Sequence, residues 1–113
     1  MSNFHKHEDE RRILYEWVEN QNFKSAKVVI VKEEMPIGDH HHNKKDETFF
    51  LLSGMLKELS LGKSRESYQK WFNIKAPYKI EVPKGHYHKF ICIKGSILLG
   101  VASEPFDETD EIR

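Results

Sequence analysis

Short apolar runs separated by turn-forming residues recur along the whole chain. In the longest, Ser25 to Glu33, the consecutive β-branched residues 28–31 favour a strand that is buried on both of its faces. A second run, Thr48–Leu52, is also apolar on both faces, as expected for a strand inside a sandwich or a barrel. Residues 79–82 alternate between polar and apolar side chains and predict a further strand.

Turn signals divide the rest of the chain in the same way. We expect further strands at residues 13–18, 55–61, 71–74, 89–93 and 96–102, and a polar hairpin loop at 62–69. Pro36 and Gly38 end the first long run, and Pro and Gly residues separate the later ones. No segment has a convincing helical pattern. The spacing therefore predicts an all-β barrel or sandwich, whose core should contain Phe49, Leu51, Phe72, Phe90 and Ile91.

The chain reads as one domain, because 113 residues are enough for a single core. Residues 1–12 are polar and charged, and we expect them to form a flexible arm with no regular structure. The folded domain would then span residues 13–113. The arm contains one H-x-H pair, His5 and His7, which we interpret as solvated terminal residues.

Charge and cysteine content narrow the range of partners. With 18 basic and 18 acidic residues, the formal net charge is zero, which predicts neither a nucleic-acid nor a membrane partner. The one cysteine, Cys92, excludes an intrachain disulfide and suits a reducing compartment; we expect it to act as a small buried hydrophobe. The N-terminus has no apolar signal region, and the apolar runs are too short to span a membrane. We expect a soluble cytoplasmic protein.

The densest group of metal-ligating side chains lies in Gly-Asp-His-His-His at residues 38–42, followed by Glu47. On an extended strand, His40 and His42 would share one face, whereas His41 would point to the other face, either into solvent or packed between strands. Imidazole and carboxylate are the usual side-chain ligands of divalent transition metals. The segment therefore predicts part of a metal site.

A second histidine group follows the turn at Pro83-Lys84-Gly85. On a strand, His86 and His88 would point to the same face. If that face is inward, His88 can meet His40, His42 and Glu47 inside a barrel. Three neutral imidazoles and one carboxylate would leave one or two coordination positions open, as in catalytic sites. His86 is either a residue at the rim, an additional ligand or an acid–base group.

These two segments resemble the two motifs of the cupin superfamily. The first motif is H-x-H, three or four residues, Glu, six residues and Gly, which matches residues 40–54. The second is Pro-x-Gly-x-x-His, which matches residues 83–88. The sequence departs from the family pattern at two positions: Gly38 is only two residues before the first histidine, and Cys92 stands where the family often has Asn.

The resemblance implies a double-stranded β-helix, or jelly roll, with a metal deep in the barrel mouth. The expected ligands are His40, His42, Glu47 and His88, and the expected cofactor is a divalent transition metal: Zn, Fe, Mn or Ni. The family also forms dimers by sheet packing or strand exchange, so we expect a homodimer. The His-rich opening and the stretch from Gly95 to Asp107 resemble sugar-modifying cupins.

Three functions remain open at this point. The first is an isomerase- or epimerase-like enzyme acting on a carbohydrate or nucleotide-sugar, in which a Lewis-acid metal polarises an oxygen and His86 or Tyr87 moves the proton. The second is a non-haem iron dioxygenase of a small molecule, since this ligand set also suits iron. The third is a non-enzymatic cupin that binds a small ligand.

Overall fold

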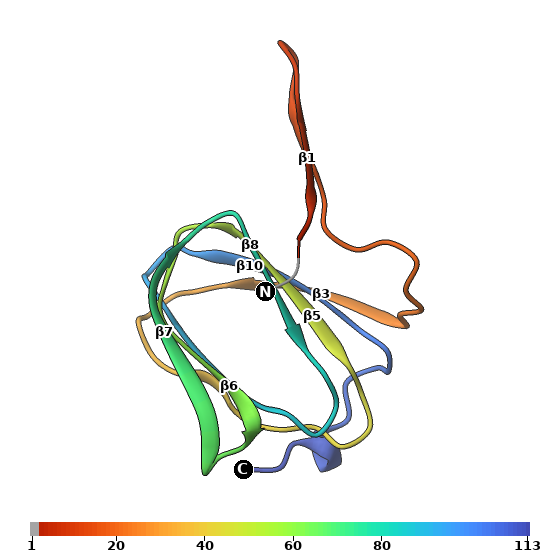
Figure 1. Cartoon of the computed structure of the whole chain (residues 1–113), viewed down its shortest axis with the longest axis vertical. Coiled ribbons are helices and arrows are strands. Elements are labelled where there is room, and N and C mark those ends of the chain that lie inside the picture. The colour runs from red at the N-terminus through yellow and green to blue at the C-terminus, as the bar shows by residue number, and fades with distance from the viewer. Residues whose placement is uncertain (1–2) are drawn as a thin grey trace.

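Two four-stranded antiparallel sheets face each other to form a jelly-roll barrel (Figure 1). The computed structural model describes residues 3–113. The first sheet has the order β3 (Ser25–Ile30), β10 (Ile97–Ala102), β5 (Glu47–Ser53) and β8 (Tyr78–Val82). The second has the order β4 (Ile37–His40), β9 (Tyr87–Cys92), β6 (Met55–Ser64) and β7 (Ser67–Lys75). The prediction of an all-β double-stranded β-helix is confirmed.

The hydrophobic core lies between the two sheets, because alternate residues of each strand point inward. Phe49, Leu51 and Phe90 are buried there as predicted, and Cys92 is free and fully buried. Phe72 was wrongly placed in the core, since 62% of it is exposed. It lies on the edge strand β7, opposite Glu58 on the outer face.

The alternation is broken in β7 by Asn73, whose φ of 56° lies in the left-handed region. Trp71 and Ile74, which flank the pair Phe72 and Asn73, both pack against the core, and Phe72 faces outward. Ile91, another expected core residue, is only half-buried. Alternation from the inward Trp71 already places Phe72 on the outer face, so the strand pattern does not account for the expectation that this aromatic residue is core.

Strand β3 is buried on one face only, whereas the sequence predicted burial on both. Val29 and Val31 pack against the core, but Val28 and Ile30 are 63% and 66% exposed. The β-branched run identified the strand correctly and gave no information on what covers its outer face.

The N-terminal residues form a hairpin, whose first strand lies in the arm where no regular structure was expected and whose second strand lies within the strand predicted at residues 13–18. β1 (His5–Glu8) pairs with β2 (Ile13–Glu16) and projects from the barrel (Figure 1). The turn is stabilised because Asp9 accepts hydrogen bonds from the backbone N–H groups of Arg11 and Arg12. The base of the hairpin is anchored by an aromatic cluster around the fully buried Phe50 of β5, made up of Phe4, Tyr15 and Trp17.

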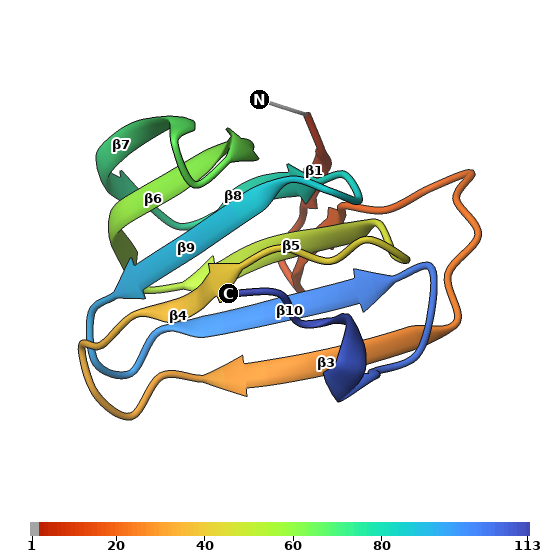
Figure 2. The same cartoon turned by 90° about the horizontal axis from the view of Figure 1, so that it is seen from below.

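The C-terminal segment returns to the barrel and ends beside β4 (Figure 2). It contains the 3-10 turn η1 (Glu108–Asp110), the only helical element among the described residues. Ile112 exchanges two backbone hydrogen bonds with His41, of 2.9 and 3.0 Å. The loop expected at 62–69 is largely strand, since β6 and β7 continue to the turn at residues 65–66. Within residues 3–113 no helix is long and apolar enough to span a membrane.

Candidate metal centre

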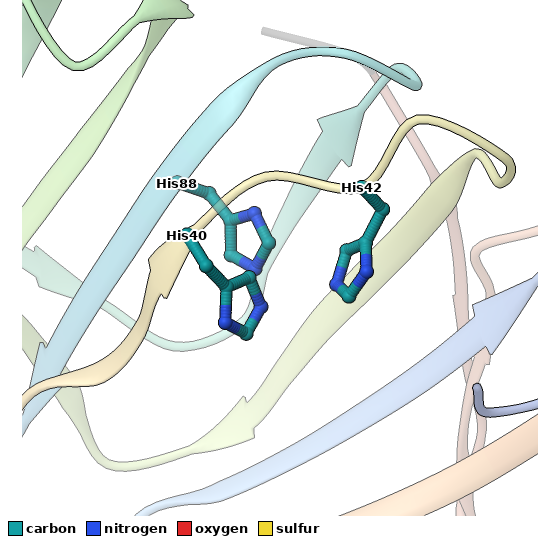
Figure 3. A group of neighbouring side chains, drawn as sticks. All are labelled: His40, His42 and His88. Carbon is teal, nitrogen blue, oxygen red and sulfur yellow. The ribbon is translucent and has the colours of Figure 1, made fainter. Parts of the chain in front are cut away.

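Three histidines converge inside the barrel mouth. His40 ends β4, His42 follows it, and His88 lies opposite His40 on β9. All three are buried, and each offers a ring nitrogen within 4.8 Å of the others (Figure 3). The ring centroids of His40 and His42 are 4.5 Å apart, and those of His40 and His88 are 4.7 Å apart. The structure thus brings together the three imidazoles that the sequence singled out.

The backbone before His40 is shaped for this arrangement. The pairing of β4 with β9 shifts between Gly38 and His40, and both Gly38 and Asp39 have positive φ, 86° and 61°. A Cβ added at Gly38 would lie 2.8 Å from Cδ2 of the His88 ring. Only glycine therefore leaves room for that imidazole at this point.

The two sequence motifs are joined at their backbones. Gly85, in the turn before β9, donates its N–H to the carbonyl of His42 at 2.5 Å. His41 is not among the converging histidines, as predicted from the alternation of side chains, and its backbone pairs with Ile112.

Glu47 completes the group from the opposite sheet. Its Oε1 lies 3.3 Å from Nε2 of His42 and 4.0 Å from Nε2 of His88. Its Oε2 lies 3.2 Å from Nζ of Lys27 and 3.9 Å from Nζ of Lys45. Burial acts to raise the pKa of Glu47, but the surrounding positive groups, Lys27 foremost, bring the pKa below its ordinary value. Glu47 is therefore an anion at neutral pH.

Burial keeps the imidazoles uncharged. It lowers the pKa of His40 to about 4 and that of His88 to about 3. Burial also lowers the pKa of His42, although the charge of Glu47 acts in the other direction. Neutral imidazole is the form that binds a metal.

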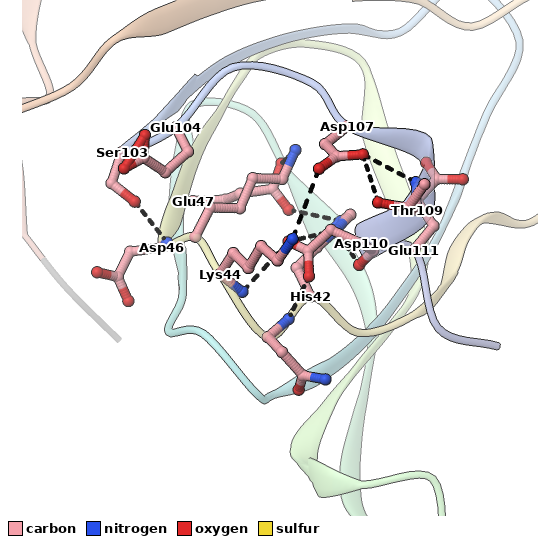
Figure 4. A network of polar contacts seen from close by, with 12 residues as sticks. His42, Lys44, Asp46, Glu47, Ser103, Glu104, Asp107, Thr109, Asp110 and Glu111 are labelled. Atoms are coloured by element: carbon pink, nitrogen blue, oxygen red, sulfur yellow. Dashed lines mark hydrogen bonds and ion pairs between the residues drawn. The ribbon is translucent and has the colours of Figure 1, made fainter.

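The C-terminal segment fixes the tautomer of His42 (Figure 4). Nδ1 of His42 lies 3.0 Å from the carbonyl oxygen of Asp110. Because a carbonyl can only accept, Nδ1 must carry the proton, and Nε2 of the neutral ring then has a free lone pair. Asp110 is itself buried, and its carboxylate accepts the backbone N–H groups of Asn43 and Lys44.

This tautomer places two acceptors face to face, Nε2 of His42 and Oε1 of Glu47 at 3.3 Å. Glu47 Oε1, His40 Nδ1 and His88 Nδ1 are also buried with no hydrogen-bond partner among the described residues. Facing acceptors and unpaired buried polar atoms are unfavourable unless a cation or a proton lies between them. The donor set, three imidazoles and one carboxylate, fits a divalent transition metal.

The two residues predicted to move protons lie apart from the converging nitrogens. His86 is in the turn before β9, half-buried, with Nδ1 3.5 Å from the carbonyl of Lys84. Tyr87 is on the face of β9 opposite to His88, and its hydroxyl donates to Oδ1 of Asp39 at 2.7 Å. Their catalytic roles remain predictions.

Sequence reasoning missed three residues that shape the site. Lys27 could have been found, because it shares parity with the inward residues Val29 and Val31 of an otherwise apolar strand. Lys45 and Asp110 lie in segments without a strand pattern and carry no such signal. A cavity of about 140 Å³ is lined by the two lysines and by Phe106. A larger pocket of about 370 Å³ is lined by residues 21–23 and by residues of the first sheet, among them Glu47.

No protein-family model and no curated protein matches the sequence. Among solved structures, a TDP-quinovose 3,4-ketoisomerase from Campylobacter jejuni is 21% identical, with a TM-score of 0.85 over 98% of this chain and 88% of that chain. A sugar 3,4-ketoisomerase from Thermoanaerobacterium thermosaccharolyticum, in complex with TDP, is 21% identical, with a TM-score of 0.78 over 97% and 83%. The Mycobacterium tuberculosis rmlC epimerase is 14% identical, with a TM-score of 0.78 over 96% and 64%.

At these identities the likeness shows the fold. The chain has the cupin-type jelly-roll fold that its two motifs predicted, and its structural neighbours are sugar-modifying enzymes. Within that fold it carries a buried group of three histidines and one glutamate.

Proposed function

We propose that this protein is a metal-binding cupin enzyme that isomerises or epimerises a carbohydrate, and that its substrate is a nucleotide-linked keto sugar. The observation that carries the proposal is the convergence of three neutral imidazoles on an ionised Glu47 inside the barrel mouth. The fold supports the substrate class, because similar barrels belong to ketoisomerases described in complex with TDP and with TDP-4-keto-6-deoxyglucose.

His40, His42, His88 and Glu47 would hold the metal, which would act as a Lewis acid on the substrate's carbonyl oxygen. The rest of the site serves these ligands. The carbonyl of Asp110 directs the lone pair of His42 Nε2 into the site, and Lys27 and Lys45 keep Glu47 ionised. Such outer contacts orient ligands and tune their basicity.

Isomerisation of a keto sugar also requires a group that takes a proton from the carbon next to the carbonyl and returns it elsewhere. His86 is our candidate, since it is half-buried in the turn that leads to His88. Tyr87 is less suited to this step, because its hydroxyl is engaged by Asp39 on the other side of the strand.

The test combines metal analysis with solvent exchange. Purified protein should contain about one transition-metal ion per chain, and His42→Ala should contain almost none. Incubation with TDP-4-keto-6-deoxyglucose and related keto-sugar nucleotides in D₂O should place deuterium on a carbon next to the carbonyl, and His86→Gln should slow this exchange.

Equal metal content in the wild type and His42→Ala would overturn the ligand set. Absence of exchange with every keto-sugar nucleotide would overturn the isomerase assignment. Iron loading with oxygen uptake would instead favour the dioxygenase, and tight binding of a sugar nucleotide without turnover would favour a non-enzymatic binding protein.

We also propose that the protein is a homodimer that packs the outer face of its first sheet against a second copy. That face exposes Val28 and Ile30 on β3 and Leu52 on β5. An exposed apolar sheet face is typical of an interface. Light scattering should give the mass of a dimer for the wild type and of a monomer for Ile30→Lys. A monomeric wild type would contradict the proposal.

A further inference from the structure

His40 and His88 lie opposite each other on two neighbouring strands, and the residues just before them in the sequence, Asp39 and Tyr87, are hydrogen-bonded on the other face of these strands. His40 of β4 pairs with His88 of β9. The residue before each histidine points to the outer face of the second sheet, and there Tyr87 donates a hydrogen bond to Oδ1 of Asp39 at 2.7 Å. Only 4% of Tyr87 is exposed, whereas the Asp39 side chain is 44% exposed, so the bond is shielded from solvent on the tyrosine side alone.

Asp39 has a backbone conformation that needs support. Its φ of 61° lies in the left-handed region, which costs a non-glycine residue of the order of 1 kcal/mol. This conformation coincides with the shift in pairing between Gly38 and His40, and a shift of this kind re-aims the side chain that follows it.

Arg65 supplies the support from the turn between β6 and β7. Its Nη1 donates to Oδ1 of Asp39 at 2.6 Å, and its Nη2 donates to the backbone carbonyl of Asp39 at 2.8 Å. The guanidinium therefore binds both the carboxylate and the backbone carbonyl of Asp39, and this carbonyl belongs to the peptide that leads into His40.

Aromatic packing completes the cluster. The Arg65 guanidinium lies 4.9 Å from the centre of the Tyr87 ring. The centre of the Tyr68 ring lies 5.4 Å from the centre of the Tyr87 ring. The hydrogen bond from Tyr87 and the contact with Arg65 lower the pKa of Asp39, which favours the ionised carboxylate, the stronger acceptor for both donors.

We propose that Asp39, Tyr87 and Arg65 form an outer brace that sets the positions of His40 and His88 for metal binding. Tyr87 and Arg65 are then positioning residues and have no contact with the reacting atoms. The proposal deepens the proposed function and rests on it for the identity of the bound group. What the brace itself fixes, the separation of two imidazoles, is a property of the metal-free protein as well.

The experiment compares Tyr87→Phe with a matched control on the same sheet face. Lys70→Gln is the control, since it removes the neighbouring ion pair of Lys70 with Glu58 on β6 and β7 at 2.6 Å and leaves the hydrogen bonds of Asp39 with Tyr87 and Arg65 in place. Binding of Co²⁺ is followed by its visible absorption, which reports ligand geometry. Tyr87→Phe should weaken Co²⁺ binding about tenfold and alter the spectrum, because loss of a hydrogen bond to a charged group is of that size. Lys70→Gln should change neither.

Asp39 variants separate the brace from backbone strain. Asp39→Gly tolerates the positive φ and keeps the backbone carbonyl that accepts from Arg65, but it loses both contacts of the carboxylate, so it should bind Co²⁺ as weakly as Tyr87→Phe. Asp39→Asn keeps an acceptor oxygen and also tolerates the left-handed region, so it should retain most of the affinity. Wild-type affinity and spectrum in both Tyr87→Phe and Asp39→Gly, with reduced thermal stability only, would overturn the proposal and leave the cluster a purely structural contact.

A metal-independent measurement distinguishes failure of the brace from failure of the proposed function. In metal-free protein, proton NMR should give a strong cross-relaxation signal between the rings of His40 and His88, whose centroids are 4.7 Å apart. This signal should weaken in Tyr87→Phe. If the wild type binds no Co²⁺, the proposed metal function fails, and this signal alone decides the brace: an unchanged signal in Tyr87→Phe overturns it.

Discussion

Two groups of side chains in this protein have the composition of a metal site, and each includes a histidine from an H-x-H pair. His5 and Glu16 on the N-terminal hairpin, with Glu19 just after it, bring their ligand atoms as close together as do the three barrel histidines. This hairpin group is exposed, and Nε2 of its histidine lies 3.4 Å from the carboxylate of Glu19. The barrel group is buried, and two of its rings have a nitrogen without a partner among the residues described.

The difference shows that spacing alone does not make a site. Ligands on an exposed hairpin remain hydrated and mobile, so a metal must compete with water and must also order the side chains. Ligands in the barrel have already lost water and are held in place by the fold. The predictions below break or sharpen this contrast, beginning with the largest effect.

Removing one histidine from each group should have opposite results. His42→Ala removes a buried ligand whose partner, Glu47, would be left facing only His88 and two lysines. We expect loss of nearly all bound metal, a decrease in affinity of at least about a hundredfold. His5→Ala should leave the metal content unchanged. Elemental analysis of the purified proteins tests both, and metal lost equally from the two variants would mean that the hairpin takes part in binding.

Filling the space beside His88 should damage the barrel site through packing alone. Gly38→Ala combines a positive φ with a Cβ 2.8 Å from the imidazole, and we expect a loss of about 3 kcal/mol in unfolding free energy. Gly95→Ala is the matched control. Gly95 has a similar φ of 89°, but no atom lies within 4 Å of the added Cβ, so about 1 kcal/mol should be lost.

Denaturant unfolding of the metal-free variants measures this difference. Equal losses in the two alanine variants would show that the close approach to His88 carries no energetic weight.

The barrel histidines also show how much of the candidate site could be predicted from the sequence. Strand parity and the two motifs correctly placed His40, His42 and His88, because a period of two residues determines which side chains share a face. Parity also separated His41 from them. Phe72 was wrongly expected in the core, although alternation from the inward Trp71 places it on the outer face.

Contacts between distant segments could not be predicted in this way. Asp110 reaches His42 from the C-terminal turn, and Arg65 reaches Asp39 across the sheet. Neither residue stands out in a pattern of apolar and polar positions, because each depends on where the chain returns in space. Burial of Lys45 has the same origin.

Acidification should destabilise the metal-free protein because of the buried histidines. In the unfolded chain a histidine titrates near pH 6.5, whereas burial lowers the pKa of His88 to about 3 and that of His40 to about 4. Between these values the unfolded state binds protons that the folded state does not, so unfolding becomes easier as the pH falls below about 6.5. Each such histidine contributes up to about 1.4 kcal/mol per pH unit.

Denaturant unfolding at a series of pH values between 7 and 4 measures this dependence. His88→Gln removes one of the groups and should flatten the curve relative to the wild type. A curve of unchanged slope in His88→Gln would show that this ring is protonated as readily in the folded protein as in the unfolded chain.

The smallest effect concerns the charge beside the barrel carboxylate. Lys27 places its ammonium 3.2 Å from Oε2 of Glu47, although about half of the lysine side chain is exposed and its charge is partly screened. If Lys27 mainly competes with the metal for the carboxylate, Lys27→Met should strengthen Co²⁺ binding severalfold, since one positive charge is removed near a divalent cation. If instead it mainly orients Glu47, binding should weaken. We expect strengthening, because Lys45, itself buried, still holds the same oxygen at 3.9 Å.

Titration with Co²⁺ at two ionic strengths distinguishes the two roles of Lys27. An electrostatic effect on Co²⁺ affinity shrinks in high salt, whereas an effect from lost orientation of Glu47 does not.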